Sequence, residues 1–139
     1  MITKGKTIVQ SLIQEVWNGG KLAAIEQFYA PTIVRRQPPF PPVKGLAAYR
    51  DFLATTFATF ANLHMTATEI VAEGDTVVLH GTWSANQTGP VAWADLPATN
   101  KPFEVAYCTV LHLQDDKVVE ELVYVDHLGL LQQLRTGPT

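Results

Sequence analysis

The first third of the chain carries hydrophobic residues at the spacing of a helix. From Thr7 to Trp17 they recur at steps of three and four, as on one stripe of an α-helix, and Asn18-Gly19-Gly20 ends the pattern. The same spacing predicts two further helices, whose apolar faces are Leu22, Ile25 and Phe28 in one, and Leu46, Tyr49, Leu53, Phe57 and Phe60 in the other.

Between the second and third helices, Thr32 to Gln37 predicts a short strand. Four prolines at positions 38, 39, 41 and 42 then surround Phe40. Proline cannot donate to a strand ladder or continue a helix, so this stretch predicts a stiff extended connection.

The pattern changes after Asn62, where β-branched and aromatic residues dominate and the period shortens towards two. Four strands are predicted at 64–72, 75–85, 103–113 and 117–126, with tight turns at Glu73-Gly74 and Asp115-Asp116. Residues 86–102 form a long loop, which is typical of a functional or mobile segment. A short amphipathic helix closes the chain, with Leu128, Leu130, Leu131 and Leu134 on its apolar face.

Helices first and strands second indicate an α+β fold. We expect a curved, mainly antiparallel sheet shaped as a cone, with three N-terminal helices packed on its concave face and a short C-terminal helix. A cone of this kind commonly encloses a pocket, so we expect a small-molecule site.

Composition narrows the class of protein. The 139 residues (15.3 kDa) predict a single domain over 1–139, and 47% hydrophobic with 17% charged residues is typical of a compact soluble chain. The net charge of −3 and the lack of a basic cluster argue against a nucleic-acid partner. The single cysteine, Cys108, favours a reducing cytoplasm, and neither zinc-type spacing nor a membrane or signal segment is found.

The turn at Asp115-Asp116 predicts which side chains share a sheet face. If Gln114 opposes Lys117, directly opposed residues of the antiparallel pair point the same way. One face then carries Val105, Tyr107, Thr109, Leu111, Glu120, Leu122, Tyr124 and Asp126, and the other carries Ala106, Cys108, Val110, Val119, Glu121, Val123 and Val125. We assign the first face to the pocket and the second, aliphatic face to the interface of a homodimer. A three-residue turn would exchange the two faces.

Asp126 is the main catalytic candidate on the pocket face. A carboxylate at the edge of an apolar cavity has its charged form disfavoured, which raises its pKa towards the range useful for proton transfer. The alternative is structural: Asp126 directly precedes the last helix, where it would cap free backbone N–H groups. Spacing alone does not separate the two roles.

The other candidate residues are weighed in the same way. His64, His80 and His112 have no partner at metal-ligand spacing and are expected in ordinary surface or packing roles, while His127 follows Asp126 directly. Ser11 and Ser84 lie in no nucleophile elbow, and no phosphate-binding loop is present. Three aromatic residues serve either as core and lid or as ligand platforms: Trp83, Trp93 and Phe40.

Residues 118–134, VVEELVYVDHLGLLQQL, resemble the C-terminal signature of the SnoaL-like polyketide cyclases, within the nuclear transport factor 2-like superfamily. Further segments agree in order over nearly the whole chain: EVWNGGKLAAIEQFYAP, KGLAAYRDFL, AEGDTVVLHGTW and LPATNKPFEV. The superfamily uses one cone for isomerases, cyclases, hydrolases, dehydratases and binders, so fold alone does not give the reaction.

The resemblance implies a role for Asp126, which matches the general acid/base of the cyclases at the end of the last strand. Three positions depart from the family pattern. Arg36 stands where a histidine is frequent, Leu122 where a tryptophan is common, and Gln87 where the loop entry usually has a histidine. The usual substrate therefore does not transfer directly to this chain.

Together these observations predict an enzyme that needs no metal or organic cofactor. Asp126 would remove an acidic C–H proton from a polyketide-like carbonyl compound, the enolate would close a ring, and the proton would be returned. The developing oxyanion would accept from Tyr107, Thr109 or Tyr124, and we expect the remaining substrate contacts from Leu122, Trp83, Arg36, Phe40 and Trp93. The alternatives are a double-bond isomerase of the ketosteroid type and a non-catalytic protein that binds a small apolar ligand.

Overall fold

In a computed structural model that describes residues 4–136, the helices precede most of the sheet, as predicted. Helix α1 (Lys4–Leu12) continues as a π-helical segment, η1 (Ile13–Asn18), and is followed by the 3-10 turn η2 (Leu22–Ala24) and α2 (Ile25–Phe28). Helix α3 spans Leu46–Thr59 and α4 spans His127–Thr136. Phe60, expected at the end of the third helix, instead has extended backbone and begins a strand.

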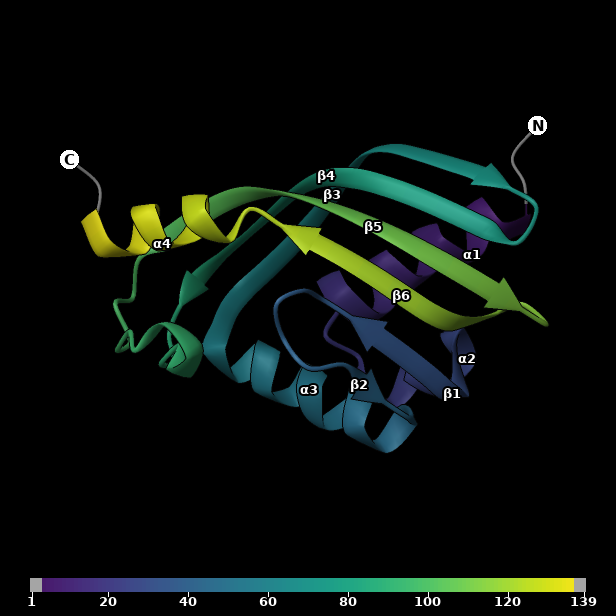
Figure 1. The fold of residues 1–139 in the computed structure, drawn as a ribbon, viewed down its shortest axis with the longest axis horizontal. Helices are drawn as coiled ribbons and strands as arrows, with labels where there is room; N and C mark the ends of the chain where they lie inside the picture. Colours follow the sequence, from purple (N-terminus) through teal and green to yellow (C-terminus); the bar gives the residue numbers. More distant parts are fainter. Residues whose placement is uncertain (1–3, 137–139) are drawn as a thin grey trace.

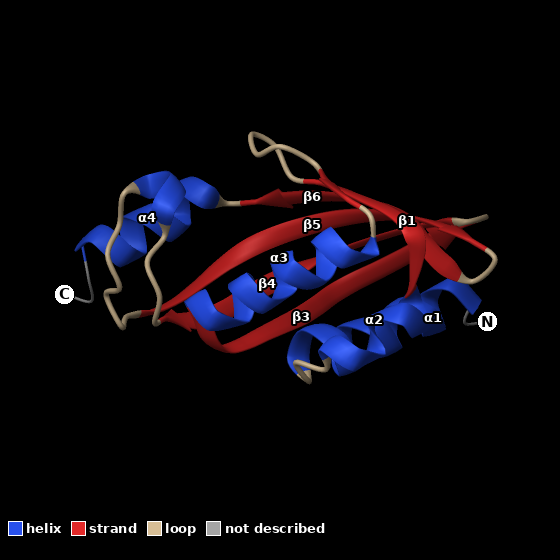
Figure 2. Cartoon of the chain, turned by 90° about the horizontal axis from the view of Figure 1, so that it is seen from below, coloured by secondary structure: helices blue, strands red, loops and turns tan. Residues whose placement is uncertain are grey.

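Six strands form one curved sheet in the order β2-β1-β6-β5-β4-β3. Their bounds are Tyr29–Arg36 (β1), Val43–Lys44 (β2), Phe60–Glu73 (β3), Thr76–Gln87 (β4), Pro102–Gln114 (β5) and Lys117–Val125 (β6). All neighbours are antiparallel except β1 and β6, which are parallel. Helices α1, α2 and α3 cover the concave face, and α4 lies beyond the end of β6 (Figures 1 and 2). The α+β cone predicted from the sequence is confirmed.

Close contact between two long strands accompanies the bend of the sheet. The pairing of β3 and β4 shifts register between Ala67 and Glu69. Opposite this irregularity stands Gly81, where a Cβ atom would lie only 1.7 Å from the backbone oxygen of Thr66. A side chain at position 81 would therefore push the strands apart, and glycine permits the close approach that the curved sheet needs.

The proline-rich connection after β1 is a turn, which corrects the expected extended segment. The Pro38–Pro39 peptide is cis, and the backbone N–H of Phe40 donates to the oxygen of Gln37 at 2.9 Å. The chain therefore reverses here, and the turn brings Phe40 back to the open side of the cone.

The two-residue turn at Asp115-Asp116 is confirmed, but the predicted face assignment of β6 is wrong. Both aspartates have positive φ, and Gln114 pairs with Lys117 as expected. A bulge follows, because Leu113 pairs with Val118 whereas His112 pairs with Glu120. One extra residue on β6 turns every later side chain to the opposite face.

The bulge leaves β5 as predicted and exchanges the two faces of β6. Thr109 and Leu111 of β5 point to the concave face and are opposed there by Val123 and Glu121. Leu122 and Tyr124 point to the convex face, and Tyr124 is 52% exposed. The face proposed as an interface therefore carries these two side chains in place of Glu121, Val123 and Val125.

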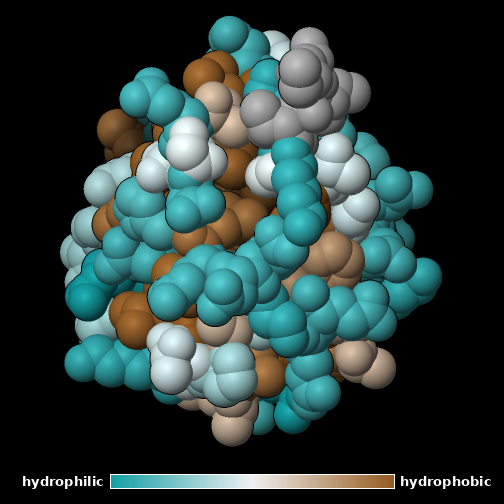
Figure 3. Space-filling view, turned by 90° about the vertical axis from the view of Figure 1, so that its right-hand side faces the viewer, coloured by the Kyte–Doolittle hydropathy of each residue, from teal (hydrophilic) through white to brown (hydrophobic). Residues whose placement is uncertain are grey.

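The core fills the space between the concave face and the helices. The larger set of buried apolar side chains joins α1, α3 and β1 to the sheet, and a smaller set packs α4 onto β5. The end of the molecule where the hairpin turns lie is mostly hydrophilic, with hydrophobic side chains visible between the polar ones (Figure 3). Among residues 4–136, no helix has both the length and the hydrophobicity to cross a membrane.

Candidate functional site

The concave face and the helices enclose a cavity of about 420 Å³. Most of its lining is hydrophobic, and α1, η1, α3, the sheet and the loop 88–101 all contribute. The aromatic members of the lining are Trp17, Phe40, Phe52, Phe60, Trp83 and Trp93. The polar members are Arg35, Gln37, Thr55, Thr56, Thr59, Thr109, Glu121 and His127. A cavity of this size and character suits a small, largely apolar molecule.

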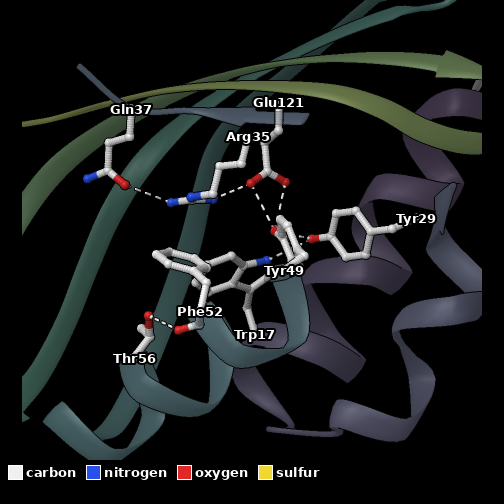
Figure 4. A network of polar contacts seen from close by, with 8 residues as sticks. All are labelled: Trp17, Tyr29, Arg35, Gln37, Tyr49, Phe52, Thr56 and Glu121. Atoms are coloured by element: carbon white, nitrogen blue, oxygen red, sulfur yellow. Dashed lines mark hydrogen bonds and ion pairs between the residues drawn. The ribbon is translucent and has the colours of Figure 1, made fainter. Parts of the chain in front are cut away.

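A buried ion pair forms the centre of the polar lining (Figure 4). The guanidinium of Arg35 on β1 donates to Glu121 on β6, and both side chains are more than nine-tenths buried. The guanidinium also lies over the rings of Phe52 and Trp17, with its central carbon 4.5 and 5.3 Å from the two centroids. Burial opposes the charge of Arg35, but the nearby Glu121 carboxylate raises the pKa of the guanidinium above its usual value.

Two buried tyrosines continue the hydrogen bonds on the inner side of Glu121. A carboxylate can only accept, so the hydroxyl of Tyr49 donates to its oxygens at 2.9 and 3.1 Å. Because the single hydroxyl proton of Tyr49 is donated to Glu121, Tyr49 accepts from the hydroxyl of Tyr29 at 2.9 Å. Tyr29 in turn accepts from Trp17 Nε1 at 3.2 Å. Burial, followed by the charge of Glu121, raises the pKa of both tyrosines well above 10.

Arg35 also connects the buried pair to the cavity mouth. Its Nη2 donates to Gln37 Oε1 at 3.0 Å, and Gln37 Nε2 lies 3.0 Å from His127 Nε2. One chain of polar contacts therefore runs from Trp17 in the core to His127 at the start of α4. We call it the polar chain; its members are Trp17, Tyr29, Tyr49, Glu121, Arg35, Gln37 and His127.

Three rings from separate segments surround the mouth. Phe40 comes from the turn after β1, Trp93 from the 3-10 turn η3 (Ala92–Ala94) in the loop 88–101, and His127 from α4. Their centroids lie 5.2 to 5.5 Å apart with edge-to-face geometry. Such contacts hold the imidazole against apolar surface on two sides.

The loop that carries Trp93 is fixed by Gln87, which is fully buried. Gln87 Nε2 donates to the backbone oxygens of Gly89 and Pro97 at 2.8 and 2.9 Å, and its Oε1 accepts the backbone N–H of Thr99 at 3.1 Å. Gln87, which stands where the resembled family often has a histidine, therefore positions the loop and lies outside the cavity lining.

The protonation of His127 follows from this surrounding. Desolvation lowers the pKa of the imidazole below 6.5, and the neighbouring Asp126 carboxylate opposes the shift by raising it. The net effect is a lowered pKa. His127 is therefore neutral at neutral pH and available to accept a proton.

Asp126 lies outside the cavity lining, so the expected pocket orientation of this carboxylate is wrong. The side chain is exposed, and its Oδ1 accepts the backbone N–H of Gly129 at 2.9 Å, the contact of a helix cap. A Cβ atom at position 129 would meet Asp126 Oδ2 at 2.3 Å, so glycine leaves room for the cap. Of the two roles that the sequence allowed, the structure has the cap.

Half of the other predicted contact residues line the cavity, and half do not. The lining includes Thr109, Trp83, Phe40 and Trp93 and lacks Tyr107, Leu122, Tyr124 and Arg36.

Each absence has a physical cause. Tyr107 points inward, but its hydroxyl donates to the backbone oxygen of Thr66 at 3.2 Å and burial raises its pKa to about 12. The bulge turns Leu122 and Tyr124 outward. Arg36 alternates with Arg35 and points away from the cavity.

Seven polar lining residues were missed from the sequence, and they are Arg35, Gln37, Thr55, Thr56, Thr59, Glu121 and His127. Arg35 and Glu121 each have a neighbour of the same type, Arg36 and Glu120, so the sequence alone does not show which member points inward. The sequence feature that could have revealed Arg35 and Glu121 is the occurrence of opposite charges on two mostly apolar strands. The other members of the two pairs, Arg36 and Glu120, meet across the convex face at 3.4 Å.

The described residues 4–136 contain no group of three or more histidine, cysteine or acidic side chains placed to hold a metal ion. Two lining residues carry buried N–H groups without a hydrogen-bond partner, Arg35 Nε and Trp83 Nε1.

Comparisons with known proteins agree with this geometry. The model of the SnoaL-like polyketide cyclase family matches residues 7–134. A candidate SnoaL-like polyketide cyclase from Jannaschia sp. CCS1 superposes with a TM-score of 0.87 at 23% identity, covering 97% of this chain and 94% of that one. A candidate polyketide cyclase from Acidithiobacillus ferrooxidans gives a TM-score of 0.85 at 25% identity, covering 99% of both chains.

A third similar structure is IdmH, a candidate polyketide cyclase from Streptomyces antibioticus, with a TM-score of 0.79, 22% identity and coverage of 96% of this chain and 99% of that one. No curated protein matches this chain by sequence.

Proposed function

Since this chain belongs to the SnoaL-like polyketide cyclase family, we propose that its cavity binds a polyketide-like carbonyl compound and closes a ring by an intramolecular aldol-type reaction, with His127 as the general acid/base. The reaction moves one proton out and back and needs no cofactor. The observation that carries the proposal is a neutral imidazole at the mouth of a mostly apolar cavity.

The proposed reaction transfers one proton between the substrate and His127 and needs no other reactant. The imidazole takes the proton of a C–H group between two carbonyls, and the C–H electron pair becomes an enolate. The enolate carbon bonds to a second carbonyl carbon of the same molecule, whose oxygen becomes an alkoxide. The imidazolium then returns its proton to that oxygen, so the product is an isomer of the substrate.

The cavity supports this chemistry in two ways. Its aromatic walls favour a folded substrate and exclude water from the enolate. Thr109 is one of the polar residues of the lining, and we assign its hydroxyl as a donor to a substrate oxygen. The unpartnered N–H groups of Arg35 and Trp83 also favour a ligand that brings oxygen acceptors over a hydrocarbon.

The role of Asp126 as general acid/base, which the family resemblance implies, stays a prediction. His127 is proposed in its place because the imidazole lines the cavity and the carboxylate caps α4. The two residues are adjacent, so single variants can tell their roles apart.

The test is turnover of linear poly-β-carbonyl compounds, with products identified by mass and NMR. In His127→Asn, turnover falls by about 10²- to 10⁴-fold, the usual contribution of general acid/base catalysis. Asp126→Asn keeps most of the turnover and loses part of the helix cap. Full turnover in His127→Asn, or a comparable loss confined to Asp126→Asn, rejects His127 as the catalytic group.

A second candidate function is ligand binding without chemistry, and one observation favours it. The two charged groups of the lining, Arg35 and Glu121, neutralise each other, so no unpaired carboxylate faces the cavity. If the compounds bind and are recovered unchanged, and His127→Asn alters neither affinity nor product, binding is the function.

A further inference from the structure

We propose that Gln37 is a positioning residue that sets which nitrogen of His127 carries the proton: Nδ1 is protonated and Nε2 keeps its lone pair. The catalytic meaning of this arrangement rests on the proposed function, but the arrangement itself is a property of the free protein. Gln37 lies between two partners, Arg35 and His127, at 3.0 Å from each.

Arg35 decides the orientation of the Gln37 amide. A guanidinium has donors and no acceptor, so the atom that Gln37 turns towards it has to be the carbonyl oxygen. The opposite orientation would place the NH₂ group against Arg35 Nη2, two donors at hydrogen-bond distance. Arg35 cannot turn away to avoid this, because its guanidinium is buried and bound to Glu121 (Figure 4).

With the amide oxygen fixed on Arg35, the NH₂ group of Gln37 faces His127 Nε2. This nitrogen therefore accepts, and in the neutral imidazole the proton resides on Nδ1. Protonation of His127 would place an N–H group against the NH₂ of Gln37. Rotating the amide would only move the same donor–donor clash to Arg35. The polar chain thus disfavours the imidazolium in the free protein, in addition to desolvation.

Of the groups that pack on His127, one favours the protonated imidazolium. Phe40 and Trp93 contribute uncharged rings, and Gln37 contributes an uncharged amide. The charged neighbour is Asp126, which favours the imidazolium and is outweighed.

For catalysis, the consequence is a defined base atom. The lone pair on Nε2 points towards Gln37, another residue of the cavity lining, and a bound substrate reaches it by displacing the Gln37 amide. Since the Gln37 amide can return only to an unprotonated Nε2, its contact with His127 forms again once the proton has passed to the alkoxide.

The test uses nitrogen-15 NMR of the histidine side chains in the unliganded full-length protein. In the unchanged protein, His127 shows an Nδ1–H tautomer with unprotonated Nε2. Gln37→Glu replaces the donor by a carboxylate that accepts from both neighbours, so the proton moves to Nε2 and the pKa of His127 rises. Gln37→Leu removes the donor without adding charge, and the Nδ1–H preference is lost.

Gln10→Glu is the matched control, because it adds the same charge on an exposed residue of α1 and leaves the His127 signals unchanged. An Nε2–H tautomer in the unchanged protein, or signals that neither Gln37 variant alters, would overturn the proposal. The measurement needs no substrate. A correct tautomer in a protein that turns nothing over rejects the proposed function and leaves the role of Gln37 in place.

Discussion

The two ends of the polar chain use the same kind of contacts and differ in burial. At the inner end, Tyr29 and Tyr49 are 0% exposed and Glu121 is 2% exposed, and their polar atoms are paired. At the mouth, Gln37 and His127 are half-buried, and the rings around them come from a turn and a long loop. At the mouth, His127 lines the cavity, and its lowered pKa keeps the imidazole neutral at neutral pH.

The difference shows that burial of a polar group decides its role. The buried carboxylate of Glu121 already accepts from Arg35 and Tyr49, with which a substrate would have to compete, and removal of this carboxylate leaves the charge of Arg35 unpaired in the core. A half-buried imidazole with one partner can exchange that partner for a substrate. We therefore assign stability to the inner end and proton transfer to the mouth.

The largest expected effect is on stability, at the inner end. Glu121→Gln removes the negative charge that neutralises Arg35, and we expect a loss of about 3–5 kcal/mol in the free energy of unfolding, measured by urea denaturation. Glu120→Gln is the matched control, because this neighbour is only half-buried and its contact with Arg36 lies on the surface, worth at most about 1 kcal/mol. Equal losses in the two variants would mean that burial does not separate the two pairs.

A smaller loss is expected from one buried hydroxyl. Tyr49→Phe deprives Glu121 and Tyr29 of a hydrogen-bond partner, and we expect a cost of about 1–3 kcal/mol in the same denaturation experiment. Tyr124→Phe removes the same atom on the convex face, where the side chain is 52% exposed, and should change stability by less than about 0.5 kcal/mol. A cost for Tyr124→Phe as large as for Tyr49→Phe would contradict the assignment.

The smallest expected effect is a pH dependence at the mouth. The pKa of His127 is lowered in the folded protein, so between that value and the unfolded value of 6.5 the unfolded chain binds more protons. Its contribution to stability is fully present above pH 6.5 and is lost as the pH falls through the folded pKa. Subtracting the pH–stability curve of His127→Asn from that of the unchanged protein should isolate this slope. A difference that instead grows as the pH falls would show that the pKa is raised.

Much of the fold could be predicted because local pattern and global fold agree. The periods of the helices and strands, the two-residue turn with its adjacent aspartates and the order of the elements all follow from nearest neighbours in sequence. The face of β6 could not be predicted, because a pair of valines is followed by a pair of glutamates and fits either phase of the alternation. One bulged residue then decided which glutamate entered the cavity.

The sequence predicted several aromatic residues of the cavity lining but not the polar chain. Phe40, Trp83 and Trp93 were named either as core and lid residues or as ligand platforms, and all three lie in the cavity lining. The polar chain was missed because each of its contacts but one joins residues at least 12 positions apart in sequence, and pairing at that range depends on register. The exception, Arg35 with Gln37, spans two residues on one strand face.

The most direct test of the central claim is the exchange of α-protons for deuterium. A small ketone whose α-protons exchange slowly is incubated in D₂O with the protein, and its NMR signal is followed over time. We predict that the unchanged protein and Asp126→Asn accelerate the exchange and that His127→Asn does not. Acceleration that survives in His127→Asn and disappears in Asp126→Asn would contradict the account and return proton transfer to the carboxylate at the helix cap.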